Sequence, residues 1–212
     1  MNRIMLHWFV GLMTVLSTAA APPAMPSAAV PALLAPSGNY RAESDHSSIV
    51  FRVQHLGMIW FTARFTAFTV EMTFDAARPE ASALNVTIDP TSVQTGVAPK
   101  PSGNLDNELA SNPKLLNSGA FPRMRFVATR IDRTGPTTAR ITGDMTILGV
   151  TRPLVLDTVF NGSLAAHPYS KKPVLGFSAT GSLKRSDYGM TYLIGMVGDE
   201  VRIAVEAELV SK

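Results

Sequence analysis

His46 and His55 carry the most versatile side chains in this sequence, because histidine can act as a general base and as a metal ligand. An odd number of positions separates them, so on one regular strand the two side chains would point to opposite faces. A metal ion shared by both is therefore not favoured. The chain also has no Cys, which excludes thiolate ligands and disulfides. We predict no metal site and no cofactor.

Asp45, His46 and Ser47 are adjacent in the chain and have the residue types of a serine hydrolase. Adjacent residues of a strand point apart, whereas a catalytic triad must converge beside an oxyanion hole. The sequence has no Gly-x-Ser-x-Gly motif either. We therefore predict no catalytic residues. The alternative is an exported enzyme of unknown reaction that uses His46 or His55.

The elements that position these residues are predicted to be strands. Apolar residues alternate with others over residues 49–55 and 68–74, and in a strand such alternation places one set on one face. We predict that these two runs form an antiparallel pair with one apolar side. His55 continues that side, so we expect it inside or at the rim. Similar runs follow at residues 84–88, 124–131, 139–148, 153–160, 174–183 and 201–209.

Residues 105–111 lack this alternation and contain helix formers, so they predict one short helix that ends before Pro113. No helix-length segment separates the other successive strands, which excludes parallel β-α-β units. The sequence therefore predicts an all-β, antiparallel domain, built as a sandwich or as a closed barrel. A barrel of about eight strands has room for one small or extended ligand.

The N-terminus has the pattern of a targeting segment. Residues 8–16 form an apolar run that is too short to span a bilayer, and small residues follow at 17–21. We expect a signal peptide at residues 1–21, an unpacked Ala/Pro-rich linker at 22–38 and the β-barrel domain at 39–212. This organisation predicts a soluble periplasmic protein without stable membrane insertion.

The charge balance excludes one class of partner. Charged residues make up 17% of the chain and the formal net charge is +3, and the sequence has no run of Lys or Arg. A nucleic-acid-binding domain shows a clustered basic patch or stripe. We therefore expect no nucleic-acid partner.

Four motifs give the sequence a family resemblance. Asp45-His46-Ser47 precedes the first predicted strand and His55-Leu56-Gly57 ends it. Residues 146–153 read Thr-Ile-Leu-Gly-Val-Thr-Arg-Pro, and residues 185–190 read Arg-Ser-Asp-Tyr-Gly-Met. With these motifs the chain resembles the YceI-like, polyisoprenoid-binding family over about residues 39–210. The resemblance implies an antiparallel, extended, lipocalin-like eight-stranded barrel with one short helical segment.

The resemblance also implies a function, which is to hold a polyisoprenoid or an isoprenoid-quinone-like lipid in the barrel for transport, storage or stress response. A homodimer is a further option. Arg185 could pair with a phosphate or quinone oxygen of the lipid. Leu115-Leu116 stands where the family has Phe-Phe, which could alter ligand preference. The candidate ligand-binding residues are Phe51, His55, Phe65, Phe68, Phe74, Phe126, Met145, Ile147, Phe177, Arg185 and Asp187. In a filled barrel the apolar ones would be plain core.

Overall fold

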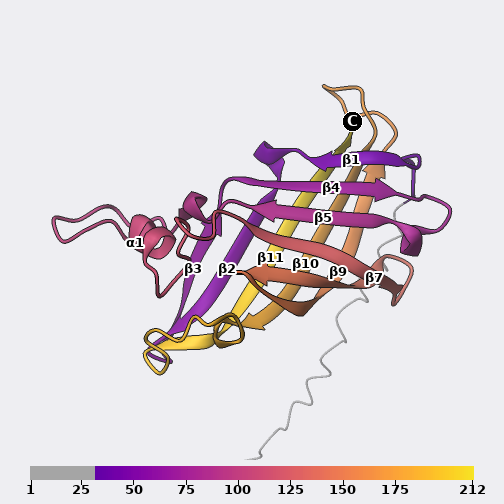
Figure 1. The fold of residues 1–212 in the computed structure, drawn as a ribbon. Coiled ribbons are helices and arrows are strands. Elements are labelled where there is room, and N and C mark those ends of the chain that lie inside the picture. The colour runs from indigo at the N-terminus through magenta and orange to yellow at the C-terminus, as the bar shows by residue number, and fades with distance from the viewer. Residues whose placement is uncertain (1–31) are drawn as a thin grey trace, which may run out of the picture.

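The computed structural model describes residues 32–212, so the expected signal peptide at 1–21 lies outside the described residues. Figure 1 shows strands that curve around a common interior, with a short helix at one side. The strands are β1 Gly38–Ala42, β2 Ser48–His55, β3 Ile59–Phe65, β4 Phe68–Phe74, β5 Ala83–Ile88, β6 Val93–Gln94, β7 Met124–Arg133, β8 Thr138–Ile147, β9 Val150–Leu164, β10 Val174–Lys184 and β11 Val197–Ser211. The helices are η1 Ser44–His46, η2 Pro79–Ala81, η3 Pro90–Ser92, α1 Leu105–Ser111 and η4 Arg185–Tyr188.

The sheet closes on itself through β11. This long strand pairs with β10 along its length, with β2 over residues 201–206 and with β1 over residues 209–211. The ring therefore runs β1-β4-β5-β7-β8-β9-β10-β11 and returns to β1. All of these pairings are antiparallel. The predicted eight-stranded antiparallel barrel is confirmed.

Three strands of the ring, which contain β1, β4 and β5, are interrupted. Their other halves are β2, β3 and β6. β1 continues as β2 after η1, β3 continues as β4 after residues 66–67, and β5 continues as β6 after η3. Each half pairs with the matching half of its neighbour, so β4 joins β1 and β5 while β3 joins β2 and β6. The breaks explain why eleven strand segments make an eight-stranded barrel.

The predicted pairing of residues 49–55 with residues 68–74 is wrong. The chain turns at Leu56 and Gly57, which have left-handed φ values of 53° and 66°, and returns as β3. β2 therefore pairs with β3, and β4 pairs with β1 and β5. Local alternation does not select the partners of a strand, and the sequence interpretation also passed over the alternating run of residues 59–65 that lies between the two.

The short helix is confirmed at its predicted position. α1 spans Leu105–Ser111, and the side-chain oxygen of Asn104 accepts hydrogen bonds from the backbone N–H groups of Asp106 and Asn107. This N-cap satisfies donors that a helix start leaves unpaired. Pro113 follows the C-terminal end, as expected.

The β8–β9 hairpin shifts one predicted boundary. Leu148 and Gly149 form a two-residue connection with φ values of 50° and 73°. Positive φ at both positions gives a turn whose twist matches that of the paired strands. β9 consequently begins at Val150 rather than at Pro153, which lies inside the strand opposite Asp144.

A second cluster of buried residues packs beside the main core, where β1, β4, β10 and β11 meet. Tyr40 is fully buried there, and its hydroxyl donates to the carbonyl oxygen of Pro36 at 2.7 Å. Ala35 joins this cluster and the backbone N–H of Leu34 donates to Ser163 Oγ. Ala35 is therefore packed against the barrel, whereas the other residues of the 32–37 stretch are exposed.

Within residues 32–212, the helices are too short or too polar to cross a membrane.

Candidate ligand-binding cavity

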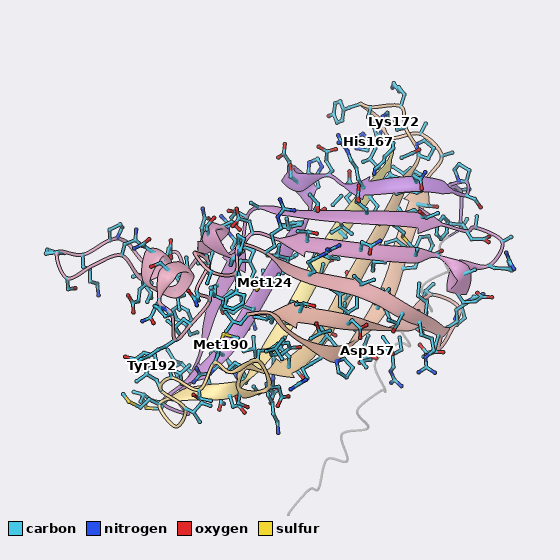
Figure 2. All side chains as sticks on the ribbon, viewed as in Figure 1. Met124, Asp157, His167, Lys172, Met190 and Tyr192 are labelled. Carbon is cyan, nitrogen blue, oxygen red and sulfur yellow. The ribbon has the colours of Figure 1, made fainter. Side chains whose placement is uncertain are left out.

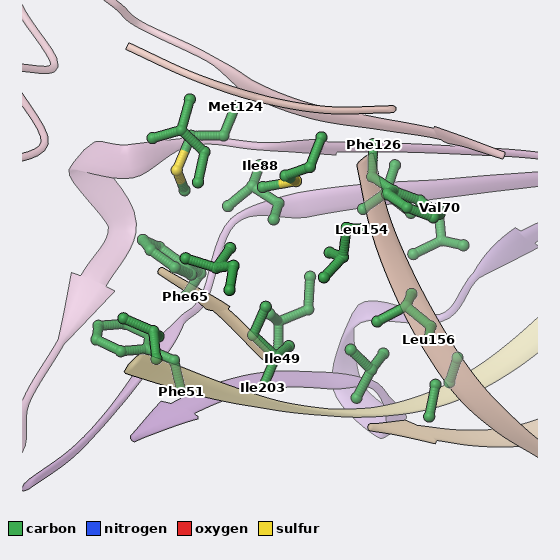
Figure 3. A pocket seen from close by; sticks show the side chains of 18 of the residues that line it. Ile49, Phe51, Phe65, Val70, Ile88, Met124, Phe126, Leu154, Leu156 and Ile203 are labelled. Atoms are coloured by element: carbon green, nitrogen blue, oxygen red, sulfur yellow. The ribbon is translucent and has the colours of Figure 1, made fainter. Parts of the chain in front are cut away.

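A cavity of about 260 Å³ lies inside the barrel. Figure 3 shows Phe51, Phe65, Phe126, Leu154 and Ile203 pointing from five different strands into one space. Their convergence follows from the period of two, because every strand of a barrel turns alternate side chains inward. The cavity wall is therefore built from the apolar set of each strand.

The inward side of β11 shows that this interior is hollow rather than filled. Val201, Ile203, Val205 and Ala207 all line the cavity, yet each keeps part of its surface accessible. In a close-packed core, side chains at these positions would lose nearly all of that surface. The remaining accessible surface faces the cavity, so these residues are lining.

Two aromatic rings form one patch of the wall. Phe51 from β2 and Phe65 from β3 stack with ring centroids 5.2 Å apart and an angle of 30° between their planes. Both residues line the cavity. A nearly parallel pair of rings presents a broad apolar surface against which a hydrocarbon chain can pack.

The structure brings most of the sequence-predicted residues to this cavity. Seven of the eleven candidates line it, namely Phe51, Phe65, Phe126, Met145, Ile147, Phe177 and Arg185. They come from β2, β3, β7, β8, β10 and η4, so segments from residue 51 to residue 185 contribute to one cavity.

The other four candidates lie outside the cavity lining. Phe74 is buried in the second cluster, where its ring packs edge-on against Tyr40 with centroids 6.1 Å apart. Phe68 is half-buried and touches both clusters. His55 and Asp187 are exposed. His55 continues the parity of Ile49, but β2 ends at this position, so of the two expected positions, inside or at the rim, its exposed side chain takes the one outside the cavity lining.

Arg185 is the charged residue among those lining the cavity, and its side chain is only 6% exposed. Its guanidinium donates hydrogen bonds to the backbone carbonyl oxygens of Met190, Tyr192, Val197 and Gly198. Guanidinium has five N–H donors, so at most one is left for a ligand. Burial lowers the pKa of Arg185, and the nearby negative charge of Asp199 opposes this change.

Asp199 lies near Arg185 outside the cavity lining, and the sequence interpretation did not single it out. Its carboxylate accepts hydrogen bonds from the backbone N–H and the hydroxyl of Ser186, at 2.9 and 2.7 Å. Burial by itself would raise the pKa of Asp199, but these hydrogen bonds and the charges of Arg185 and Lys184 outweigh it, so the net change is downward. In the sequence, Val197-Gly198-Asp199 looks like any turn before a strand, so nothing there indicated a role for Asp199.

Leu109 of α1 and Leu115 and Leu116 of the loop after it line the cavity, and α1 contacts the short strand β6. β6 contributes only two residues there, and it pairs only with Arg64 and Phe65 of β3. The helix and the loop after it therefore add leucine side chains to the cavity wall next to this strand. The segment that carries Leu-Leu in place of Phe-Phe is therefore part of the lining.

Thr158 provides an uncharged polar group in the lining and was also missed. It continues the inward parity of Leu154 and Leu156 on β9 and is 7% exposed. Its hydroxyl lies 3.4 Å from the carbonyl oxygen of Leu156 and can donate to it. The alternation of residues along β9 could have indicated that Thr158 points inward, but one threonine among apolar residues did not draw attention as a polar contact.

Within residues 32–212, the histidines form no catalytic or metal-binding arrangement around the cavity. His46 Nδ1 lies 3.5 Å from Glu208 Oε1, and His167 Nε2 lies 3.8 Å from the same oxygen. His167 Nδ1 accepts from the backbone N–H groups of Tyr169 and Ser170, so Nε2 carries the proton in the neutral ring and is unsuited to metal ligation. Among residues 32–212, no group of three or more candidate ligands could hold a metal ion.

Comparison with known sequences identifies one family. The YceI-like domain family matches residues 40–209 of this chain. Protein YceI of Salmonella arizonae is 34% identical over 166 residues, which are 78% of this chain and 82% of that protein.

Solved structures share the same fold. The Campylobacter jejuni YceI protein aligns with a TM-score of 0.63 and 26% identity, covering 75% of this chain and 90% of the other. BcnA of Burkholderia cenocepacia gives a TM-score of 0.68 at 19% identity, with 81% and 99% covered. A polyisoprenoid binding domain from Saccharophagus degradans gives 0.58 at 11% identity, with 83% and 99% covered. These similarities place the eight-stranded barrel among known architectures.

Proposed function

Because the chain belongs to the YceI-like domain family, we propose that it is an exported lipid-binding protein whose barrel holds a polyisoprenoid or an isoprenoid-quinone-like amphiphile. The lipid would be held for transport, storage or stress response. The observation that carries this proposal is the cavity inside the barrel, whose lining is apolar apart from Thr158 and Arg185. The name of the Saccharophagus degradans domain is consistent with a ligand of this class.

The physical need for such a cavity comes from the lipid itself. Each CH₂ group that leaves water contributes about 0.8 kcal/mol, so a chain of many isoprene units crosses an aqueous space too slowly without a carrier. A carrier must offer a dry, concave and mostly apolar site with a few polar groups. The cavity of this barrel has that composition.

We assign the apolar chain of the lipid to the aromatic and aliphatic lining and its polar end to the region of Arg185. Phe51, Phe65, Phe126 and Phe177 supply flat surfaces from different strands, and Met145 and Ile147 lie with them on the wall. Because the Arg185 guanidinium is largely occupied by backbone carbonyls, its contribution to a phosphate or quinone oxygen would be one hydrogen bond and its positive charge.

Export is part of the proposal. Residues 1–21 have the composition of a signal peptide, and its removal would release residues 22–212 into the periplasm. N-terminal sequencing of exported protein tests this step. Recovery of the uncleaved chain in the membrane fraction would contradict it.

A binding role is favoured over catalysis by the position of the histidines. Neither His46 nor His55 lines the cavity, so neither is placed to act on a molecule inside it. Replacing both by Ala should leave lipid uptake close to normal. An enzymatic turnover that disappears in the double variant would support the alternative of an exported enzyme.

The decisive experiment is native mass spectrometry of the protein purified from its own compartment, followed by solvent extraction. We expect one constant added mass that is extracted as a polyprenyl or quinone lipid. Repeated preparations without bound lipid, together with no uptake of polyprenyl lipids in vitro, would refute the proposal.

A further inference from the structure

Six large apolar side chains are exposed together at one end of the barrel. They belong to the β2–β3 turn, including the first residue of β3, and to the loop between η4 and β11. The most exposed are Met58 at 75%, Ile59 at 59% and Met196 at 54%. We call this set the apolar rim, and it consists of Leu56, Met58, Ile59, Leu193, Ile194 and Met196. Scattered single apolar residues are normal on a surface, whereas a contiguous group marks a contact site.

The two loops are joined directly. The backbone N–H of Leu56 donates to the carbonyl oxygen of Met196 at 2.6 Å, and His55 pairs with Val197 at the start of β11. Figures 1 and 2 show the loop between η4 and β11, which contains the labelled Tyr192, beside the ends of β2 and β3. The rim is therefore one surface rather than two separate patches.

The rim is held in place by buried interactions. Arg185 ties the loop together through the carbonyl oxygens of Met190, Tyr192 and Val197. Leu56 and Leu193 adopt left-handed φ values of 53° and 59°, which are uncommon for residues with a side chain. An ordered backbone thus presents large apolar groups to water, so the exposure is built into the fold.

The rim lies at one end of the cavity. Met190 and Val197 flank the rim residues of the loop, Val53 precedes the β2–β3 turn, and all three line the cavity. The apolar surface of the interior therefore passes into the apolar surface of the rim with little interruption. A lipid that moved along it would remain in contact with apolar groups.

Cations and aromatic rings accompany the rim. Lys114 Nζ lies 5.1 Å from the centre of the Tyr192 ring, and the Arg202 guanidinium lies 4.2 Å from the Trp60 ring. Arg52 stands opposite Arg202 across β2 and β11, and Glu200 balances part of this charge by its contact with Arg202. Tyr and Trp with adjacent Lys or Arg are typical of surfaces that rest at a lipid headgroup layer.

We propose that the apolar rim docks onto an anionic phospholipid bilayer and that lipid passes there between the bilayer and the cavity. This inference rests on the proposed function. Charge complementarity favours a bilayer over a second copy of this chain, because self-association through the rim would bring Lys114 and Arg202 of both copies together. Anionic headgroups would instead attract these cations, while Leu, Ile and Met insert among the acyl chains.

The test is sedimentation of the full chain with vesicles of phosphatidylcholine and phosphatidylglycerol. The key variant is Met58→Ser with Met196→Ser, and neither residue lines the cavity. The matched control is Val155→Ser with Val159→Ser, two exposed positions on β9. All three proteins share the same N-terminal segment, so its own membrane affinity is common to them.

We expect the rim variant to lose affinity for these vesicles roughly tenfold while the control variant binds like the parent protein. Added salt or pure phosphatidylcholine should weaken binding by the parent. Equal binding by the rim variant and the parent, or no vesicle binding by the parent, would overturn the proposal. A concentration-dependent dimer that the rim variant abolishes would also overturn it and assign the rim to self-association.

A second measurement separates this inference from the proposed function. Uptake of geranylgeraniol from vesicle-free solution reports on the cavity alone. Normal uptake without vesicle binding would refute only the docking proposal, whereas vesicle binding without uptake would refute the lipid-carrier function. Circular dichroism establishes that each variant is folded.

Discussion

The ring of Phe51 stacks on the ring of Phe65 at 5.2 Å inside the barrel. The two residues come from the adjacent strands β2 and β3, and both face the cavity. Phe51 is only half-buried, so part of its ring is available for contact with a bound molecule. The stacked pair is therefore part of the packed barrel wall and also part of the proposed binding site.

Phe51→Ala should weaken lipid uptake about tenfold or more, because it removes a ring from the cavity wall. The cost in the free energy of unfolding should stay near 1–2 kcal/mol, below the value for a fully buried Phe. Phe74→Leu is the control, since Phe74 is buried but does not line the cavity. It should reduce stability with unchanged uptake, measured by urea unfolding and a lipid-binding titration. Normal uptake by folded Phe51→Ala would place the ligand elsewhere.

Phe51→Asp is the harsher version of this change, since it places a charge on the apolar wall. It should abolish uptake, and it should also lower stability because a buried carboxylate has no partner there. Circular dichroism must show a folded protein before loss of uptake counts as support.

Arg185→Met should lower the free energy of unfolding by at least about 2 kcal/mol, because it leaves the carbonyl oxygens that Arg185 contacts without their donor. Hydrogen exchange of the backbone amides at residues 190–198 should accelerate most. Arg140→Met is the control, since Arg140 forms only an exposed ion pair with Asp157, and it should change stability by less than about 0.5 kcal/mol. Unchanged exchange in the Arg185 variant would show that the loop does not depend on this side chain.

Asp199→Asn should produce a pH-dependent loss of stability. The pKa of Asp199 is lower in the folded chain, so its carboxylate stabilises the fold at pH values above the unfolded pKa of about 3.9. That contribution disappears as the pH falls through the folded pKa. The stability difference between parent and variant should therefore be full near neutral pH and vanish in acid. A difference that persisted unchanged into strong acid would exclude the ionised carboxylate as its cause.

Leu115→Phe with Leu116→Phe should shorten the lipid that the cavity holds. Both residues line the cavity, and two added rings reduce its volume. Competition among isoprenoid alcohols of increasing length should show a lower maximum length with short alcohols retained. Leu105→Phe on α1 is the control because Leu105 does not line the cavity. An unchanged length preference in the double variant would mean that this segment does not limit the ligand.

The sequence by itself determined which faces the strands turn inward. The alternation of Val201, Ile203 and Val205 on β11 predicted one apolar side, and these residues line the cavity. The short helix at Leu105–Ser111 was likewise predicted from local pattern. Both predictions succeed because the alternation of a strand and the capping of a helix depend on residues close together in the chain, which the sequence shows directly.

The tertiary structure alone decided how the strands pair, whether the interior is hollow and what Arg185 contacts. β3 lies between the two runs expected to pair, and His55 falls beyond the end of the cavity although its parity matches Phe51. Arg185 turns to carbonyl oxygens of residues 190–198, which only the folded loop brings within reach. Strand pairing, cavity volume and hydrogen-bond partners depend on how segments far apart in the chain are placed relative to one another. Local periodicity carries no information about that placement.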